Sequence, residues 1–444
     1  MQKKDKNLLI VTTSFAPENA IGAVRLTSFA KYASLEFSHV TVIAPPIEES
    51  TLHDETLQLL DIENIEVFRT KHSIFFLILK FLRNKFLGNK KATEAIGLGK
   101  QNKSFLGLIK KYISLVIFKI YTKLKNRDFL SSSIKQYKFL IKKTKFDYIF
   151  TSYPSYSSHQ AGLRIKSQNK SIYWIADFRD PMVYKSISNS KSNQRLQDNF
   201  LDNADLAISI SNGVRELLLR SSPNAEIKVI YNGFDNVLLE SNSSIIDPNY
   251  LNFCYMGTLY GGKRDLSKFF EILDKLVSHE EIDKNKILFH YAGSDFSTLI
   301  YQAKKYSFEK NLINHGYLNR GQSIEIQSNC DFITVATWNT YHEQGILTGK
   351  IFEAFMLKKP VIGIVVGDLA NSELKSIIES RDAGMVIESE FLTDSEERRI
   401  VDLLKEIYIK KFSTPGLSSS SFFRSDVNDF HYQNLFNKLL KYLP

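Results

Sequence analysis

The chain of 444 residues is 43% hydrophobic and 24% charged, a composition that excludes a disordered protein and, at this length, favours two domains over one core. Its two cysteines, Cys254 and Cys330, exclude a disulfide scaffold and favour a reducing cytoplasmic setting. The net charge of +10 is uneven, because residues 71–145 carry 19 Lys and Arg against 2 acids and the rest of the chain sums to −7. The first apolar run is too short for a signal peptide, and no run of about 18 apolar residues predicts a membrane span.

Strands and helices alternate through the first half of the chain. Strands are predicted at residues 7–12, 39–44, 66–69, 148–152, 171–177, 206–210 and 227–230, and helices at 23–35, 157–168 and 193–204. Apolar strands that alternate with helices predict a parallel sheet with helices on both faces. We therefore expect an N-terminal Rossmann-like domain at residues 1–240, which carries the basic segment 71–145.

The same alternation begins again after a polar stretch at residues 236–248. Strands are predicted at residues 253–257, 287–292, 312–315, 331–335, 361–366 and 384–388, and helices at 266–276, 349–355, 371–379, from 395 onward and at 427–443. A second Rossmann-like domain is expected at residues 241–425, and a C-terminal helix within 426–444 is expected to pack back on the first domain. Two such domains face a cleft, and ligands bind at the carboxyl ends of parallel strands.

Residues 349–355 (GKIFEAF) predict a short helix that leads to a strand marked by Pro360. The N-terminus of a helix that starts at Gly349 and Lys350 offers backbone N–H groups and positive charge, which suit a diphosphate. Glu353 lies three residues on, on the same face as Lys350, where it could accept hydrogen bonds from ribose or sugar hydroxyls. An ordinary amphipathic helix with a surface ion pair is the alternative.

A second loop, residues 257–264 (GTLYGGKR), joins a predicted strand to a predicted helix. Gly257 permits close approach of a ligand, and Lys263 and Arg264 could neutralise phosphate oxygens. Lys350 is expected to meet these two cations across the same strand ends, and three cations from two loops favour a binding site over a purely structural role.

The candidates in the first half are weaker. Gly22 stands where the loop at residues 15–25 enters a helix, so the backbone could approach a ligand there, although a plain connecting loop is the alternative. Asp180 ends a strand within the sequence DFRDP, either facing the cleft or forming a turn that pairs locally with Arg179. His159 lies at a helix start. No histidine has metal-ligand spacing and no Asp-x-Asp pattern occurs, so no metal site is predicted.

Taken in order and spacing, these motifs resemble family-4 glycosyltransferases of the GT-B fold, particularly the bacterial surface-polysaccharide enzymes. The resemblance rests on residues 15–25, 153–159, 177–181, 232–235, 255–260 and 349–353 with Pro360, and it covers nearly the whole chain. It implies an α/β protein of two doubly wound, parallel-sheet domains that face a central cleft. It also implies a UDP- or GDP-linked sugar donor held mainly by the second domain, with metal-independent, retaining transfer and no further cofactor.

The resemblance also assigns residues in the second domain. Lys263 or Arg264, together with Lys350, match the positions that grip the donor diphosphate. Glu353 matches the second glutamate of the family's E-x7-E motif, which addresses the ribose.

This sequence departs from the family pattern at two places. The first glutamate of the motif falls at Gly345, so Glu343 or the backbone of Gly345 would have to make the donor-sugar contact. Ser152 and Tyr153 stand where many relatives carry a cleft histidine, and His159 is a candidate replacement. A front-side reaction needs no enzyme nucleophile, because the leaving phosphate can take the acceptor's proton.

The basic segment predicts a membrane partner. At helical pitch, residues 105–124 put Phe105, Ile109, Ile113, Val116 and Ile120 on one face, with Lys110, Lys111, Ser114, Tyr121 and Lys125 roughly opposite. A basic amphipathic helix is typical of an element that lies on an anionic membrane surface. A solvated helix face is the alternative, and the absence of a recognised module argues against nucleic acid.

The expected function is therefore extension of a lipid-linked glycan in surface-polysaccharide synthesis, as for an O-antigen or a capsule. The enzyme would be cytoplasmic and bound peripherally to the inner face of the membrane. The alternatives are a nucleotide-sugar epimerase of the same fold and an inactive subunit that docks a partner, and Gly345 is the residue that favours the last. The oligomeric state is not predictable from these motifs.

Overall fold

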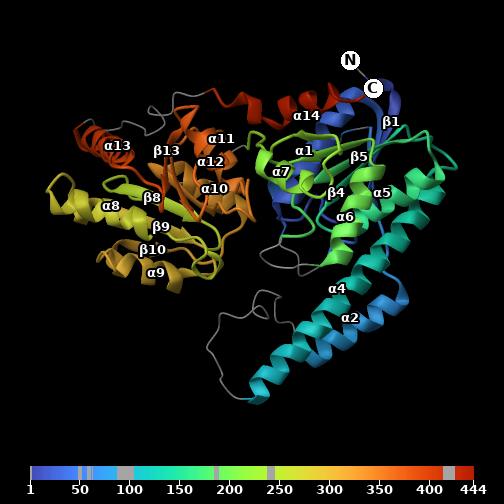
Figure 1. Cartoon of the computed structure of the whole chain (residues 1–444), viewed down its shortest axis with the longest axis horizontal. Helices are drawn as coiled ribbons and strands as arrows, with labels where there is room; N and C mark the ends of the chain where they lie inside the picture. The colour runs from blue at the N-terminus through green and yellow to red at the C-terminus, as the bar shows by residue number, and fades with distance from the viewer. Residues whose placement is uncertain are drawn as a thin grey trace.

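The computed structural model describes residues 3–48, 53–57, 62, 64–87, 105–184, 190–237, 246–413 and 426–444. Two α/β domains lie beside each other, and a pair of helices projects from the first of them (Figure 1). Each domain contains one parallel sheet, with seven strands in the first and six in the second.

The first sheet has the strand order β3-β2-β1-β4-β5-β6-β7, and neighbouring strands pair in parallel. Its strands are β1 (Lys3–Val11), β2 (Phe37–Ala44), β3 (Ile65–Arg69), β4 (Tyr148–Tyr153), β5 (Tyr173–Phe178), β6 (Leu206–Ser209) and β7 (Ile227–Val229). The connecting helices include α1 (Ile21–Glu36), α5 (Tyr156–Gln168), α6 (Lys191–Asn203) and α7 (Asn212–Leu219).

Alternation along β1 explains why this sheet is covered on both faces. Leu8 and Ile10 join the apolar cluster beneath α1, whereas Leu9 and Val11 join the cluster formed with α5 and α6. All four side chains are buried, so both faces of the strand are apolar and each needs a layer of helices.

The second sheet has the order β10-β9-β8-β11-β12-β13. Its strands are β8 (Leu251–Met256), β9 (Ile287–Ala292), β10 (Leu312–Asn314), β11 (Phe332–Trp338), β12 (Val361–Val366) and β13 (Gly384–Glu388). Its helices are α8 (Ser267–Ser278), α9 (Phe296–Lys304), α10 (Arg320–Asn329), α11 (Gly349–Met356), α12 (Glu373–Glu379) and α13 (Asp394–Ser413). The predicted fold class, two doubly wound parallel-sheet domains, is confirmed.

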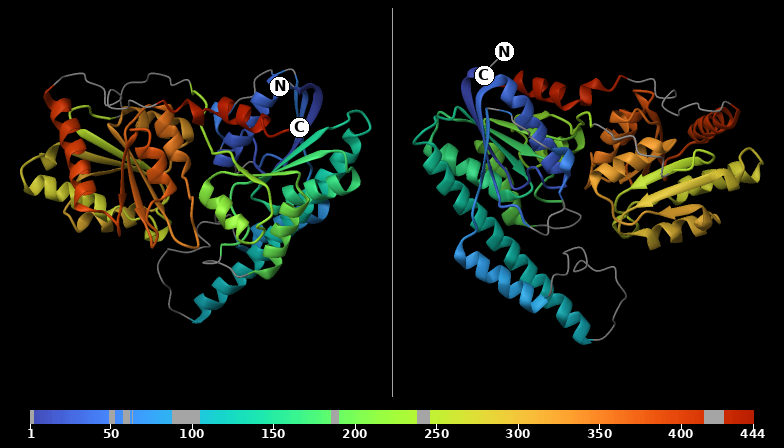
Figure 2. Two further views of the ribbon diagram at one scale, coloured as in Figure 1. Left: turned by 45° about the horizontal axis from the view of Figure 1, so that its top comes forward. Right: turned by 180° about the vertical axis from the view of Figure 1, so that it is seen from behind.

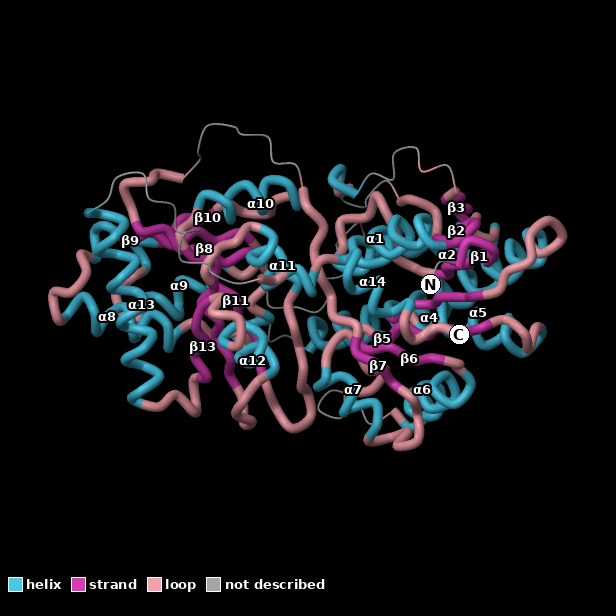
Figure 3. Tube along the Cα trace, turned by 90° about the horizontal axis from the view of Figure 1, so that it is seen from above, coloured by secondary structure: helices cyan, strands magenta, loops and turns pink. Residues whose placement is uncertain are grey.

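The C-terminal helix α14 (Tyr432–Leu440) leaves the second domain and packs on α1 of the first (Figure 3). The ring of Phe29 lies 6.0 Å from that of Tyr432 and 5.6 Å from that of Phe436, both in edge-on contact. The apolar face of α14 therefore fills the first domain's core although the second domain precedes it in the chain.

The basic segment forms the projecting helix pair, α2 (Ile74–Leu87) and α4 (Phe105–Leu140) (Figure 2). The predicted amphipathic helix at residues 105–124 lies within α4. The side chains of residues 105–116, on which most of that pattern rests, are outside the described part of the structure. Of the helices that the structure describes, none combines the length and hydropathy that a membrane crossing requires.

Candidate functional site

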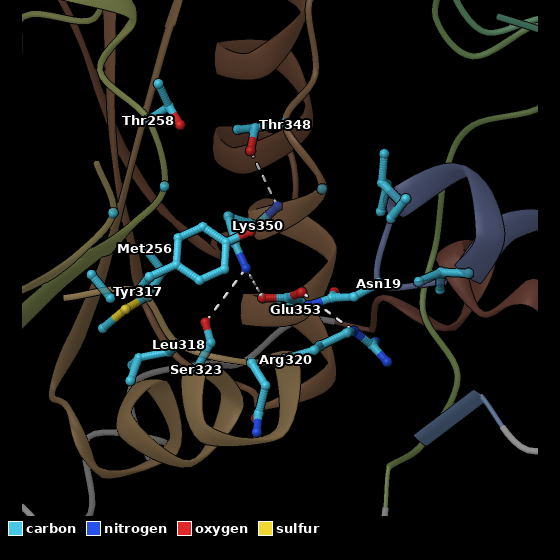
Figure 4. Close-up of a pocket in the computed structure, with 18 of the residues that line it drawn as sticks. Asn19, Met256, Thr258, Tyr317, Leu318, Arg320, Ser323, Thr348, Lys350 and Glu353 are labelled. Carbon is cyan, nitrogen blue, oxygen red and sulfur yellow. Dashed lines mark hydrogen bonds and ion pairs between the residues drawn. The ribbon is translucent and has the colours of Figure 1, made fainter. Parts of the chain in front are cut away.

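A cavity of about 300 Å³ lies between the two domains (Figure 4). The second domain supplies residues that follow the carboxyl ends of β8 and β9, the loop that enters α10, and the first turn of α11. The first domain supplies the start of α1. The lining includes Asn19, Gly257, Tyr317, Arg320, Lys350 and Glu353. Its position, outside the carboxyl ends of parallel strands, is where α/β proteins of this kind bind ligands.

The start of α11 closes one side of the cavity. Thr348 caps this helix, and its hydroxyl oxygen accepts a hydrogen bond from the backbone N–H of Lys350 at 3.2 Å. A side chain at Gly349 would lie 2.6 Å from Cδ1 of Ile21 in the first domain. Gly349 therefore lets the helix start approach the opposite domain closely.

Glu353 is buried at the bottom of the cavity among hydrogen-bond donors and positive charge. Its Oε2 accepts hydrogen bonds from Lys350 Nζ at 2.9 Å and from Gln327 Nε2 at 2.8 Å. Arg320 Nε lies 3.6 Å from the other carboxylate oxygen. Burial raises the pKa of the Glu353 carboxyl, but Lys350, Arg320 and Gln327 outweigh it and hold the pKa below its usual range. Glu353 is thus ionised at neutral pH.

Arg320 connects the cavity to the first domain and was not among the predicted residues. Its Nη1 donates to Thr56 Oγ1 at 2.7 Å and lies 3.4 Å from the carboxylate of Asp54, which is buried. Arg320 is the first residue of α10, which begins at a capping box between Asn319 and Gln322. The N-x-x-Q pattern of residues 319–322 is the sequence signal that predicts this helix start. It would also have placed Arg320 near the carboxyl ends of the strands of the second sheet.

The structure does not bring Lys263 and Arg264 into the cavity with Lys350. Lys263 Nζ lies 2.6 Å from Glu343 Oε2 and 4.0 Å from the centre of the Trp338 ring. Arg264 Nη1 donates to the carbonyl oxygen of Thr258 at 3.1 Å. Of these groups only Thr258 lines the cavity, so the expected cluster of three cations is not found in its lining. The physical reason is that Arg264 binds a carbonyl of its own loop, whereas Lys263 is held by Glu343 in the segment before α11.

Glu343 and Gly345 also lie outside the cavity lining. The buried carboxylate of Glu343 accepts from Lys263 and, at 2.5 Å, from the indole N–H of Trp338. Gly345 has a φ of +66°, and a side chain there would lie 2.4 Å from Ser211 Oγ and 2.7 Å from Cα of Gly213. A glutamate at this position would collide with the first domain, which explains why the family's residue cannot stand here.

Gly22 makes room for the side chain of an arginine. A side chain at this position would lie 2.2 Å from Nη1 of Arg179, whose Nε donates to Ser152 Oγ at 3.1 Å. Asp180 follows this arginine and accepts a hydrogen bond from Tyr184 Oη at 3.1 Å. Burial raises the pKa of the Asp180 carboxyl in spite of Arg179 and Tyr184. Neither Gly22 nor Asp180 lines the cavity.

His159 belongs to the core of the first domain. It is fully buried, its Nδ1 lies 2.8 Å from Thr151 Oγ1, and its ring lies 4.6 Å from that of Phe178 and 5.5 Å from that of Phe200. Burial lowers the pKa of His159 to about 3, and Arg179 adds to the effect. His159 does not line the cavity, and its burial among aromatic rings is typical of a core residue.

A buried ion pair, also missed from the sequence, fixes helix α1, whose first residue is Ile21 and which follows the loop that carries Asn19. Arg25 of α1 lies 3.0 Å from Asp177 at the end of β5, and neither side chain is exposed. Arg25 also donates to the carbonyl oxygens of Ile230 and Tyr231. Because all three guanidinium nitrogens donate hydrogen bonds, Arg25 holds the start of α1 at a fixed place beside the cavity.

Several solved structures resemble this arrangement along nearly their whole length. Sucrose-phosphate synthase from Thermosynechococcus elongatus aligns at a TM-score of 0.59 and 12% identity, covering 98% of each chain. Anabaena HepE in complex with UDP aligns at 0.56 and 14% identity, also covering 98% of each. The apo form of the lipopolysaccharide outer core galactosyltransferase WaaB aligns at 0.54 and 12%, covering 98% of this chain and 100% of that one. The fold is that of the GT-B glycosyltransferases.

No protein-family model and no curated protein matches the sequence. In the GT-B fold of this chain, the cavity is built from the start of α11, the loop into α10 and the start of α1. Within the described part of the chain, no three His, Cys, Asp or Glu side chains gather where they could hold a metal ion.

Proposed function

We propose that this chain is a glycosyltransferase that takes a sugar from a nucleotide-sugar donor bound in the cavity between its domains. The observation that carries the proposal is the cavity itself. It lies outside the carboxyl ends of β8 and β9, both domains line it, and it combines Lys350 and Arg320 with the buried carboxylate of Glu353. Its volume of about 300 Å³ is at the lower end of what small-molecule sites enclose.

The donor that we propose first is a UDP-linked sugar, ahead of a GDP-linked one. The support is the HepE neighbour, whose structure contains UDP. Lys350, 28% exposed, would exchange part of its contact with Glu353 for the donor diphosphate. The ionised Glu353 would accept hydrogen bonds from ribose hydroxyls, as the family resemblance implies.

Lys263 and Arg264 act on the donor through the loop that they hold. Arg264 binds the carbonyl of Thr258, and Thr258 lines the cavity. The contact of Lys263 with Glu343 joins this loop to the segment before α11. We therefore propose that these two cations position the floor of the site and contribute positive potential, without direct contact with phosphate in this arrangement.

The proposed reaction is front-side, metal-independent transfer with retention. An acceptor hydroxyl oxygen bonds to the anomeric carbon, the bond from that carbon to the donor phosphate breaks, and the departing phosphate oxygen takes the hydroxyl proton. The protein's contribution is to position the reactants and to stabilise the negative charge that builds on the diphosphate. We keep Asp180 as the candidate catalytic residue on the acceptor side, because it follows the end of β5 in the first domain.

The acceptor that we propose is a lipid-linked glycan of bacterial surface-polysaccharide synthesis, as expected for the family-4 enzymes that the sequence resembles. Two observations support this choice. One neighbour is a lipopolysaccharide outer core galactosyltransferase, and the first domain carries a projecting basic segment.

A transfer assay tests this function. The purified chain is incubated with radiolabelled UDP- or GDP-sugars, with and without total bacterial lipid extract, and label in the lipid fraction is counted. We expect one donor to label lipid, and Lys350→Ala to reduce that labelling at least about tenfold. Lys304→Ala, which changes an exposed lysine of α9, is the matched control and should keep the activity.

The other outcomes identify the alternatives. Conversion of a nucleotide sugar in the absence of any acceptor would make the chain an epimerase. Nucleotide binding with neither conversion nor transfer from any donor would make it an inactive subunit of GT-B fold.

A further inference from the structure

Helix α2 exposes a continuous apolar face at the projecting end of the first domain. Six large apolar side chains, each between 41% and 78% exposed, make up this face: Ile74, Phe75, Leu77, Ile78, Phe81 and Leu82. At about 100° per residue they fall within an arc of about 160°. In a soluble protein, a helix normally buries such an apolar stripe against a core. The stripe on α2 is instead exposed, which indicates that a partner covers it.

The opposite side of α2 is already occupied. Phe76 is buried, and its ring lies 5.3 Å from that of Tyr121 of α4 and 4.8 Å from that of His72. Arg83 lies over the Tyr121 ring at 4.3 Å. Because these contacts fix the rotation of α2 against α4, the apolar face must point away from α4.

The base of the helix pair is held together by hydrogen bonds to Asp128 of α4, and it is joined to the rest of the first domain through Glu48. His72 Nδ1 lies 2.9 Å from Asp128 Oδ2, and Asp128 also accepts from the backbone N–H of Ser73 at 3.0 Å. Glu48 binds Lys80 of α2 at 3.4 Å and Lys125 of α4 at 3.7 Å. The pair therefore projects as a fixed unit, and its outer face can meet a planar surface without any loss of core packing (Figures 1 and 2).

The helix pair that carries this apolar face is strongly basic. Lys71 precedes α2, and Lys119 and Lys123 are exposed on the side of α4 that is turned away from α2. Residues 71–145 as a whole carry 17 Lys and 2 Arg against 2 acids. A partner must therefore offer an apolar interior and a negatively charged surface at the same time.

We propose that the α2 face docks on an anionic lipid bilayer. Its apolar side chains enter the interface between headgroups and acyl chains, and the net positive charge of residues 71–145 attracts the anionic lipid surface. A second copy of this chain is a poorer occupant, since it would bring two strongly basic segments together. The sequence pattern predicts a docking face on residues 105–124 of α4, of which the structure describes side chains only from residue 117 onward, and the apolar stripe of α2 is a separate face.

The proposal stands apart from glycosyl transfer, because it requires only lipid and can be tested without a donor. The full chain is sedimented with vesicles of phosphatidylcholine alone or of phosphatidylcholine mixed with phosphatidylglycerol. We expect binding to the mixed vesicles, at least about tenfold weaker binding to the neutral ones, and weakening by salt. Phe75→Ser combined with Phe81→Ser should weaken binding to mixed vesicles at least about tenfold.

The matched control is Tyr301→Ser combined with Phe391→Ser, two exposed aromatic residues of the second domain. It should bind lipid like the unchanged chain. All four positions are exposed, so melting curves should show that both double variants keep the fold.

A fluorescence measurement reports insertion directly. The emission of Phe81→Trp should shift to the blue when mixed vesicles are added, whereas that of Phe391→Trp should not. Unchanged binding of the α2 double variant, or no binding of the unchanged chain to mixed vesicles, would overturn the proposal. Concentration-dependent dimers that the α2 double variant abolishes, without lipid binding, would assign the face to a second copy.

Discussion

Among single residues, Glu353 determines how charge is arranged in the cavity. Its carboxylate holds Lys350 at 2.9 Å and lies 3.6 Å from Arg320, which also lies 3.4 Å from the carboxylate of Asp54. Two cations therefore face two carboxylates, and Lys350, the more exposed cation, is the one that a diphosphate could draw from Glu353. The contact of Lys350 with Glu353 follows from their spacing in the sequence. The approach of Arg320 does not, because it depends on how α10 packs against α11 and against the first domain.

His159 gives a pH dependence at the residue scale. Its imidazole has an ordinary pKa of 6.5 in the unfolded chain and a pKa of about 3 when buried. The stability that this neutral imidazole supplies is complete above pH 6.5. As the pH falls below that value, His159 binds a proton in the unfolded chain but not in the folded chain. The free energy of unfolding therefore falls by about 1.4 kcal/mol per pH unit.

Urea unfolding between pH 7 and 4 measures this slope. His159→Phe should remove about one proton's worth of pH dependence, whereas the exposed control His342→Phe should leave the slope unchanged. His290, whose pKa burial and His315 lower to about 4, adds a similar slope in every variant. Equal slopes for His159→Phe and the unchanged chain would show that His159 is not a buried neutral group.

Among the elements, the strands were the most predictable part of the chain. Runs such as residues 8–11 are apolar on both faces, and only a buried parallel strand satisfies that pattern. Helices α7, α9 and α10 were missed because they are only 8, 9 and 10 residues long, too short for a helical period to stand out. Helix α2 was missed for another reason: the run IFFLILKFL shows no polar face from which a helical period can be read.

Gly22 and Gly321 allow an element-scale prediction, since each is the second residue of its helix. A side chain at Gly22 would lie 2.2 Å from the buried Arg179 guanidinium, whereas one at Gly321 would lie 3.5 Å from its nearest neighbour, Asn319. We expect Gly22→Ala to lower the free energy of unfolding by about 1–3 kcal/mol. Gly321→Ala should raise it by about 0.4–1 kcal/mol.

Chemical denaturation of both variants decides this prediction. Similar effects of the two substitutions would mean that Arg179 does not pack against the start of α1. That outcome would also reopen Gly22 as a residue that approaches a ligand.

At the scale of the whole molecule, the two domains contact each other through groups whose pairing cannot be predicted from the sequence. Glu373 at the start of α12 accepts from the backbone N–H groups of Asn212 and Gly213 at 2.8 and 2.9 Å, so it caps α7 of the other domain. Gly345 lies against Gly213 at the same contact. These partners are more than 100 residues apart in the chain, and only the folded arrangement reveals that they close one side of the cleft.

The proposed function depends on donor binding in the cavity between these domains. Isothermal titration of UDP into the purified chain measures that binding most directly. We predict saturable binding of one UDP per chain, at least about tenfold weaker for Lys350→Ala because a charge-assisted contact with the diphosphate is lost. Lys304→Ala should bind as the unchanged chain does. Absence of binding for both UDP and GDP, or equal affinity of the Lys350→Ala and unchanged chains, would contradict the account.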